Sequence, residues 1–336
     1  MISTSHSLVQ KITQSDHAAT ARALSIVTDE EAGYEELSRR LFPFSGKCHK
    51  IGLCGPPGSG KSSLINELLP LFRAQNLRVG VLVVDPSSAM SGGAFLGDRL
   101  RIQRHALDER IFIRSLASRG RVGGIPASIF GAIHVLEAFG SDKIIIETTG
   151  TGQDEVDIAE VADTVAYVTT PSLGDEIQAM KAGAMEIADI FVVNKADLAD
   201  KDKTLADLKK ALGLLPESTN GWKRPVLPVS AKLNEGLPGL LQACADHWRH
   251  LSESGHRQQR LRRQLAKELS LHMERKILQN ALGRIKAEHI EMLVDRQADP
   301  LSLAKRLLWD SLAAQPRKHS RQEGKNAKIG SRRNRR

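Results

Sequence analysis

The sequence predicts an α/β protein with a mostly parallel sheet and helices on both of its faces. Between residues 47 and 252, short apolar runs rich in Val and Ile alternate with stretches of helical periodicity. Strands buried on both faces are apolar throughout, and helical crossovers make neighbouring strands parallel. Aromatic residues make up only 4% of the chain, so we expect aliphatic side chains to build the core.

The expected strands and helices can be placed in order. The strands are the runs KIGLCG, RVGVLVVD, RIFIRS, KIIIE, TVAYVTTP, IFVVNK and RPVLPVS. Before them, residues 1–46 predict an N-terminal arm of short helices. In the stretch TDEEAGYEELSRRLF, Thr28 is followed three residues later by Glu31, which is the pattern of a capping box. We therefore expect a helix that begins just after Thr28.

After the sheet domain, residues 253–316 predict a helical extension. Apolar side chains recur there every four residues, which gives a long charged helix one apolar stripe. Its members are Leu261, Leu265, Leu269, Met273, Ile277, Ala281 and Ile285. The stripe fits packing against its own domain or an interface between two copies of the chain, and both stay open at this point.

Positive charge is concentrated at the C-terminus. The chain carries a net +9, and residues 317–336 hold nine Lys/Arg and one acidic residue. A polar segment of this kind cannot build a core, so we expect a disordered tail. It would solubilise the protein or bind RNA or another anionic surface without specificity.

The remaining composition predicts a cytoplasmic protein. Cys48, Cys54 and Cys244 form no C-x-x-C pair, which fits a reducing compartment. The N-terminus is polar, and no apolar run approaches the roughly 18 residues that a membrane span needs.

A phosphate-binding loop follows the first expected strand. The run GPPGSGKSS matches G-x-x-x-x-G-K-[ST], and the strand before it and the helix after it predict a P-loop NTPase fold. Glycines let the backbone N–H groups surround phosphate oxygens, and the helix adds its positive end. Lys61 is expected at the β- and γ-phosphates and the Ser62 hydroxyl at magnesium. The expected phosphate-binding residues are Gly55, Pro56, Pro57, Gly58, Ser59, Gly60, Lys61, Ser62 and Ser63.

Two later strand ends predict guanine as the base. VVNKAD contains the pattern N-K-x-D in Asn194, Lys195 and Asp197. The aspartate carboxylate can accept hydrogen bonds from N1–H and the 2-amino group of guanine, a donor pair that adenine lacks. In the next run, PVSAKL, the turn Ser230-Ala231-Lys232 is expected to contact the base oxygen. The predicted ligand is GTP.

Carboxylates at two other strand ends predict a magnesium site. Asp85 ends the second strand, Asp98 closes the Gly/Ser-rich loop that follows, and Glu147 ends the strand KIIIE. Ligands gather at the carboxyl ends of parallel strands, and Mg²⁺ prefers oxygen ligands. We expect Ser62 and these three carboxylates to form the site, with Asp98 and Glu147 closest. Asp85 as a simple loop cap is the alternative.

The turn after Glu147 predicts a switch. The N–H of Gly150 can reach the γ-phosphate, so that residues 149–156 become ordered with GTP. Gln153 is a candidate for orienting the attacking water. Lys61, Glu147 and Gln153 are therefore candidate catalytic residues.

Several stretches resemble the MeaB/ArgK family of P-loop GTPases, which are associated with methylmalonyl-CoA mutase and related adenosylcobalamin-dependent acyl-CoA mutases. They are DPSS, SGG, LGD, ETTGTGQDE, GDEIQAMKAGAMEIAD and VNKADL, and the resemblance covers about residues 48–232. The family's turn is E-T-V-G-V-G-Q-S-E, so the glutamate at 147 matches the family pattern, whereas many regulatory GTPases have aspartate at this position. This chain departs from the family in FIRSLASRGRVGG and at Leu100 of GDRLR.

The resemblance implies a homodimeric GTPase chaperone that uses magnesium and times the loading of adenosylcobalamin onto an acyl-CoA mutase. It places the dimer contact in the C-terminal helices. It also places Lys181 of GDEIQAMK in a loop where its charge stabilises the transition state, although the sequence alone indicates a solvated helix residue. No D-x-H-x-x-G motif occurs, so we expect the chain not to hold cobalamin itself.

Other functions stay open. A nickel-delivery GTPase typically carries a His-rich stretch or paired cysteines, whereas His247 and His250 are isolated in this sequence. A kinase or transport ATPase is disfavoured by N-K-x-D. RNA or a ribonucleoprotein is an alternative client through residues 317–336, and deletion of those residues would separate an RNA role from a mutase role.

Overall fold

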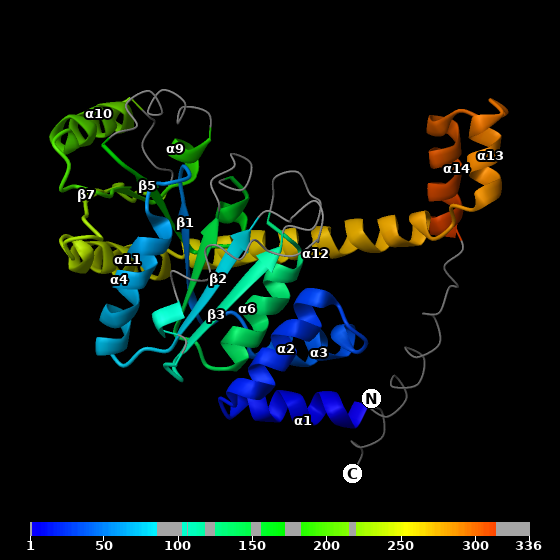
Figure 1. Cartoon of the computed structure of the whole chain (residues 1–336), viewed down its shortest axis with the longest axis horizontal. Coiled ribbons are helices and arrows are strands. Elements are labelled where there is room, and N and C mark those ends of the chain that lie inside the picture. The colour runs from blue at the N-terminus through cyan, green and yellow to red at the C-terminus, as the bar shows by residue number, and fades with distance from the viewer. Residues whose placement is uncertain are drawn as a thin grey trace, which may run out of the picture. The chain divides into compact units, whose positions relative to one another are not determined.

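The computed structural model describes residues 2–85, 103–105, 107–117, 125–148, 156–171, 183–214 and 220–313. The chain divides into two compact units, residues 1–268 and residues 269–336. The first unit contains the whole β-sheet (Figure 1).

Within the described residues, seven parallel strands form one sheet in the order β3-β2-β4-β1-β5-β6-β7 (Figure 1). All of the expected apolar runs contain a strand, so the predicted α/β fold with a parallel sheet is confirmed. The strands are β1 (His49–Cys54), β2 (Val79–Asp85), β3 (Ile111–Ala117), β4 (Lys143–Thr148), β5 (Thr164–Thr169), β6 (Ile190–Val193) and β7 (Val226–Pro228).

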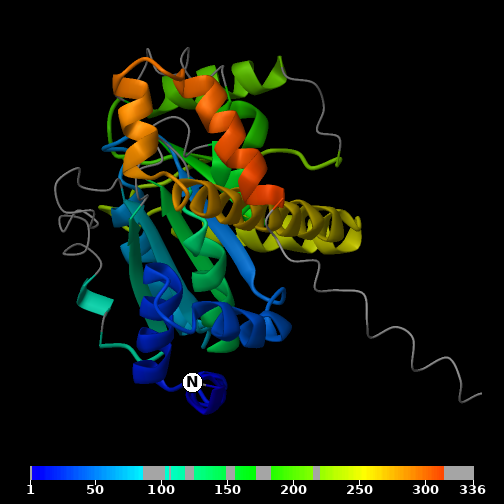
Figure 2. The same ribbon diagram turned by 90° about the vertical axis from the view of Figure 1, so that its right-hand side faces the viewer.

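Helices cover both faces of the sheet. On one face, α4 (Lys61–Ala74) and α11 (Leu237–Glu253) enclose the main core with side chains of β1 such as Ile51. On the other face lies α6 (Ser128–Ala138), which the views in Figure 1 and Figure 2 show across the sheet from α4. Gly80 of β2 allows this contact, since a Cβ there would lie 2.7 Å from Leu136.

The N-terminal helices pack outside α6. They are α1 (Ile2–Thr13), α2 (His17–Asp29) and α3 (Tyr34–Leu41). A Cβ on Gly131 of α6 would lie 3.1 Å from Val27 of α2, so the two helices are closely packed. The expected helix start after Thr28 is wrong. Thr28 is the penultimate residue of α2, which ends because Glu30 adopts a left-handed conformation with φ of 55°.

Shorter elements complete the first unit. The 3₁₀ helices are η1 (Phe42–Phe44), η2 (Gln103–His105) and η3 (Ile158–Glu160). Two further helices in the described part of the sheet region are α9 (Ala184–Ile187) and α10 (Lys201–Gly213). η3 covers β1 closely, because a Cβ on Gly52 would lie 2.7 Å from Ile158.

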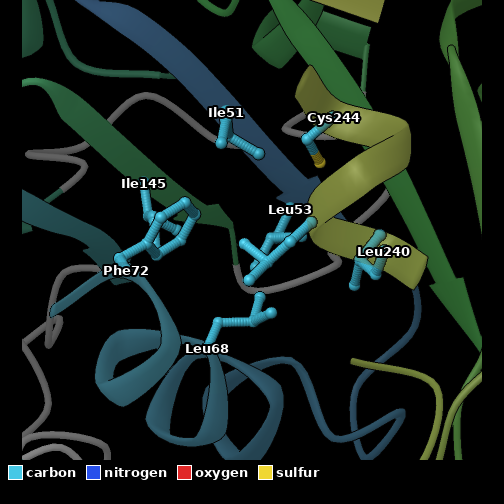
Figure 3. Close-up of a pocket in the computed structure, with 8 residues that line it drawn as sticks. Ile51, Leu53, Leu68, Phe72, Ile145, Leu240 and Cys244 are labelled. Atoms are coloured by element: carbon cyan, nitrogen blue, oxygen red, sulfur yellow. The ribbon is translucent and has the colours of Figure 1, made fainter. Parts of the chain in front are cut away.

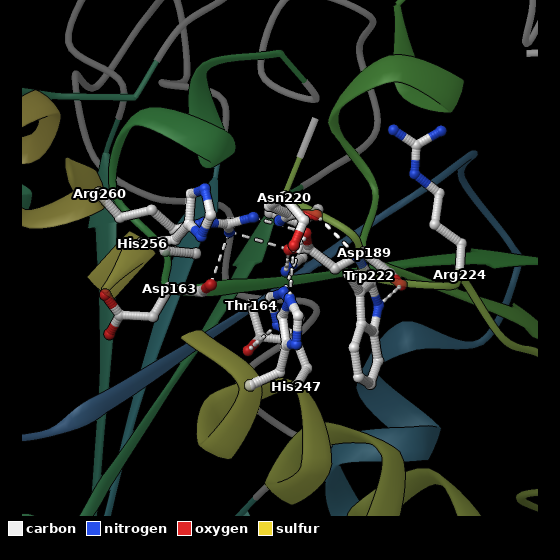
Figure 4. A network of polar contacts seen from close by, with 12 residues as sticks. Asp163, Thr164, Asp189, Asn220, Trp222, Arg224, His247, His256 and Arg260 are labelled. Carbon is white, nitrogen blue, oxygen red and sulfur yellow. Dashed lines mark hydrogen bonds and ion pairs between the residues drawn. The ribbon is translucent and has the colours of Figure 1, made fainter. Parts of the chain in front are cut away.

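A buried polar network ties the start of α12 (His256–Leu282) to the amino edge of the sheet (Figure 4). Arg260 donates to both carboxylate oxygens of Asp189, at 2.6 and 2.9 Å, and to the carbonyl of Asp163. Burial raises the pKa of Asp189, but the contact with His247, whose Nε2 lies 3.3 Å from Oδ1, and the charge of Arg260 outweigh it and hold that pKa below its usual range. The ion pair therefore fixes the first turns of α12.

The second unit is helical in its described part. It contains the rest of α12, followed by α13 (Ala287–Val294) and α14 (Pro300–Ala313). The predicted four-residue stripe is largely exposed in the single chain, with Leu269 61% and Met273 55% exposed. Other exposed apolar side chains of this unit are Leu278, Leu282, Ile285, Ile290, Val294, Leu301, Leu308 and Trp309.

No helix in the described ranges combines the length and the apolar character that crossing a membrane requires.

Candidate functional site

The loop from Gly55 to Gly60 joins β1 to α4 in a conformation that glycine alone can adopt at two positions. Gly55 has φ of 130°, and a Cβ there would lie 2.1 Å from the carbonyl oxygen of Val168. Gly60 has φ of 89°, and its Cβ would lie 2.4 Å from Nδ2 of Asn194. Gly60 also begins α4 with no side-chain cap, which leaves N–H groups of the first turn for an anion.

Lys61 and Ser62 are buried at the start of α4. Nζ of Lys61 donates to the carbonyl oxygens of Gly55 and Pro56, at 2.7 and 3.0 Å, so its charge lies over the loop. Ser62 is 7% exposed, and its hydroxyl donates to Oε1 of Glu147 at 2.6 Å. Glu147 lies on β4, which is the neighbour in the sheet of β1, the strand that leads into the loop before α4.

The pair Ser62–Glu147 fits a magnesium site. The hydroxyl has one proton and two lone pairs, so it can donate to Glu147 and still offer an oxygen lone pair to a cation. The described residues contain no cluster of three or more His, Cys, Asp or Glu side chains able to hold a metal. A site with one carboxylate, one hydroxyl and phosphate oxygens matches the way Mg²⁺ binds in nucleotide sites.

Asn194 joins three loops at the carboxyl edge of the sheet. Its Nδ2 donates to the carbonyl of Ser59 at 2.8 Å, and its Oδ1 accepts from the backbone N–H of Ala231 at 3.2 Å. Lys195, in a left-handed conformation with φ of 56°, donates from Nζ to the carbonyl of Gly58 at 2.9 Å. The phosphate loop, N-K-x-D and S-A-K therefore form one connected structure.

Asp197 presents its carboxylate to solvent beside this structure. The Ser230 hydroxyl donates to Oδ1 of Asp197 at 2.7 Å and accepts from the N–H of Leu233. The hydrogen bond from Ser230 lowers the pKa of Asp197, and the charge of Lys232 adds to the effect. Asp197 is thus held as an anion with one oxygen oriented by the protein, which suits two N–H donors of a guanine edge.

Several predicted site residues cannot be placed. Asp85 ends β2, but only its backbone is described. Asp98, Gly150, Gln153 and Lys181 lie outside the described residues.

The sequence did not indicate the structural bonds of Asn194 or the contact of Ser62 with Glu147. Each joins residues far apart in the chain, by 135 and 85 positions. His247, isolated in the sequence, is hydrogen-bonded through Nδ1 to Thr164 Oγ1 at 2.8 Å at the opposite edge of the sheet.

The family model described as "Methylmalonyl Co-A mutase-associated GTPase MeaB" matches residues 20–286. The chain belongs to the MeaB family. A putative GTPase of Pyrococcus abyssi is 40% identical over 307 residues, covering 90% of this chain and 95% of the relative. The GTPase ArgK of Escherichia coli is 32% identical over 278 residues, covering 80% of this chain and 84% of ArgK. This MeaB-family protein is accordingly a GTPase, which hydrolyses GTP.

One further relative and one solved structure are similar to this MeaB-family chain. The methylmalonic aciduria type A homolog, mitochondrial, of Caenorhabditis briggsae is 34% identical over 260 residues, covering 76% of this chain and 62% of that protein. The solved structure of an LAO/AO transport system kinase superposes with a TM-score of 0.68 at 24% identity, covering 93% of this chain and 98% of that one. The second similarity establishes the shared fold alone.

Proposed function

We propose that the three connected loops bind GTP with magnesium and that this MeaB-family GTPase serves as a chaperone of an adenosylcobalamin-dependent acyl-CoA mutase. The contact of Asn194 with both the phosphate loop and the S-A-K turn supports the GTP site most directly. In this proposal, the loops that bind the phosphates and the base are joined to each other by hydrogen bonds.

The proposed roles follow from position and charge. Residues 55–60 and the first turn of α4, with Ser63, would surround the phosphates, and Gly150 is proposed from the turn pattern in the sequence to add an N–H to the γ-phosphate. Asp197 accepts from guanine, and the S-A-K turn borders the base. Lys61 neutralises charge that develops on the transferred phosphoryl group.

Ser62 and Glu147 would hold magnesium, directly or through water, with Asp98 and Asp85 as the further carboxylates. The bound ion would neutralise phosphate charge. Gln153 is proposed to orient the attacking water, and Lys181 to add positive charge at the transition state when the client is bound. These two roles rest on the family resemblance and on the turn pattern.

Single-turnover hydrolysis of GTP tests the magnesium site. In Ser62→Ala and Glu147→Gln, the magnesium concentration for half-maximal hydrolysis should rise at least about tenfold, because each change removes an oxygen ligand or its charge. Ser252→Ala and Glu253→Gln, on exposed positions of α11, are matched controls that should leave it unchanged. If the magnesium dependence of hydrolysis is unaltered in both site variants, Ser62 and Glu147 do not bind the magnesium ion.

The client is proposed from the family match over residues 20–286, whose description names methylmalonyl-CoA mutase. The chaperone would bind the mutase in a nucleotide-dependent way and pass adenosylcobalamin to it, or hold back damaged cofactor, as GTP is turned over. Gel filtration of the two purified proteins tests the association. A complex that changes in stability between GDP and a non-hydrolysable GTP analogue supports the proposal, and no complex with either nucleotide contradicts it.

We also propose a homodimer formed through the second unit. Its exposed apolar side chains, such as Leu269 and Trp309, which is 71% exposed, are more than a soluble monomer usually leaves uncovered in one small unit. Burial of such side chains between two copies would contribute roughly 1.5–3 kcal/mol each. Leu269→Glu should therefore shift sedimentation toward the monomer, whereas Lys276→Glu, at an exposed polar position of the same helix, should not.

A further inference from the structure

A cavity of about 460 Å³ lies between α4 and α11, over the amino-terminal halves of β1 and β4. Its volume is within the range of small-molecule sites in proteins. His49 and Lys143, the first residues of β1 and β4, line it. The phosphate loop follows the last residue of β1, so the cavity is about 17 Å away from the GTP site along the strand.

The cavity has a mixed lining: alternate residues of a strand face the same side, so the apolar Ile51 follows His49 along β1. Leu53 and Ile145, further along β1 and β4, line a separate small pocket that shares Ile51, Phe72, Leu241 and Cys244 with this cavity. Figure 3 shows the lining of this small pocket, with Cys244 and Phe72 among the labelled side chains. The Cys244 thiol is uncharged there, since burial raises its pKa to about 12.

Lys143 brings a positive charge to the cavity without a counter-ion from the described residues. Its Nζ lies 3.3 Å from Nδ1 of His49, and no carboxylate of the described part of the chain is within ion-pair distance. Asp142 and Asp163 act on it only from farther away. Burial lowers the pKa of Lys143 and outweighs the opposing effect of those charges, because the ammonium has lost part of its hydration.

His49 does not share this charge, and its ring lies in a chain of hydrogen bonds. If Lys143 donates to Nδ1, the Nε2–H of His49 donates to Thr164 Oγ1 at 2.7 Å. The Thr164 hydroxyl then donates to Nδ1 of His247 at 2.8 Å, and Nε2 of His247 faces Asp189 at 3.3 Å (Figure 4). Burial, followed by the charge of Lys143, holds the pKa of His49 well below its usual value.

We propose that this cavity binds a short aliphatic monocarboxylate, with the carboxylate on Lys143 and the chain along Ile51, Phe72 and Leu241. One ammonium matches one carboxylate charge, and a phosphate dianion would leave charge uncompensated in a partly desolvated site. The amide of Gln75 lines the cavity as a further donor, whereas Gln242 already donates from Nε2 to Oδ1 of Asp246 at 2.9 Å. Apart from His49, Lys143, Gln75, Gln242 and the thiol of Cys244, the cavity is lined by apolar side chains, which suits an alkyl chain.

The test is a titration of the full-length, GDP-bound protein with hexanoate, hexan-1-ol and inorganic phosphate. Trp248 stacks on His49 with ring centroids 4.5 Å apart, so its fluorescence reports on the cavity. Hexanoate should bind saturably, at least about tenfold more tightly than hexan-1-ol, which is what a charge-assisted hydrogen bond usually contributes. Phosphate should give no saturable signal. Absence of hexanoate binding, or equal affinity for the alcohol, would overturn the proposal.

Variants locate the site. Lys143→Met should weaken hexanoate binding about tenfold or more and leave basal GTP hydrolysis unchanged, whereas Lys209→Met, at an exposed position of α10, should change neither. Cys244→Phe fills part of the cavity and should abolish binding while Lys143 is retained, so the test does not depend on one variant folding. Hexanoate binding that survives both substitutions would place the ligand elsewhere.

Discussion

Replacing Gly60 by alanine should weaken nucleotide binding through Asn194. The new Cβ would lie 2.4 Å from Nδ2 of Asn194, a distance that side chains do not tolerate. Asn194 must move, and it would lose its hydrogen bonds to the Ser59 carbonyl and from the Ala231 N–H. Two hydrogen bonds at about 1 kcal/mol each give about 2 kcal/mol.

Backbone strain adds to this cost. Alanine at a φ of 89° costs about 1–2 kcal/mol. The free loop can relax, but nucleotide binding requires its original form, so both costs should appear in the affinity. The sum, about 3–4 kcal/mol, corresponds to a loss of roughly 150- to 800-fold.

Gly58→Ala is the matched control. Gly58 has φ of 77° but open space where a Cβ would stand, so this variant carries the strain without the collision. Titration with a fluorescent GTP analogue should show Gly60→Ala binding about 30-fold more weakly than Gly58→Ala. In an Asn194→Ala background, the extra penalty of Gly60→Ala should disappear, a coupling of about 2 kcal/mol. Equal affinities of the two glycine variants, or no coupling, would refute the reasoning.

Three further outcomes follow from the described contacts. Asp197→Asn should lower GTP affinity at least about a hundredfold and favour xanthosine triphosphate, measured by competition, because the carboxylate that accepts two guanine N–H groups is lost. Lys50→Met should reduce the free energy of unfolding by about 3 kcal/mol in urea titrations, since Asp163, 3.1 Å from Nζ and 5% exposed, would stay buried with its charge uncompensated. The pKa of His49 in the folded protein is well below its unfolded value of 6.5, so the unfolded chain binds more protons near that pH. The free energy of unfolding should therefore fall as the pH drops through 6.5, by up to about 1.4 kcal/mol per pH unit. His49→Gln should flatten this slope. A steeper slope in that variant would contradict the assignment.

The strands were predictable from the sequence because their signal is local. Runs such as KIIIE are continuous in apolar residues, and β4 occupies Lys143–Thr148 as expected. The helix start at Thr28 failed because the capping pattern is local too, and α2 continues through it to pack on α6. In α12, the buried positions include Gln264 and Leu271, which depend on what the helix contacts and not on its own four-residue stripe.

In the candidate site too, the short motifs were predictable from the sequence and the contacts between them were not. The motifs around Lys61 and Asn194 could be read from the chain, since each is a short pattern after a strand. The contacts between them could not, because the partner of Asn194 lies 135 residues away and that of Ser62 lies 85 residues away. Hydrogen bonds of this kind depend on strand order, which short patterns do not specify. The assigned roles of these residues in GTP binding stay predictions.

The most direct measurement is the rate of GTP hydrolysis by the purified protein, alone and with a methylmalonyl-CoA mutase, alongside Lys181→Ala. The account predicts slow hydrolysis by the protein alone, a many-fold rise with the mutase, and loss of that rise in the variant. Tight GTP binding with no change in rate on adding the mutase would contradict the proposed client.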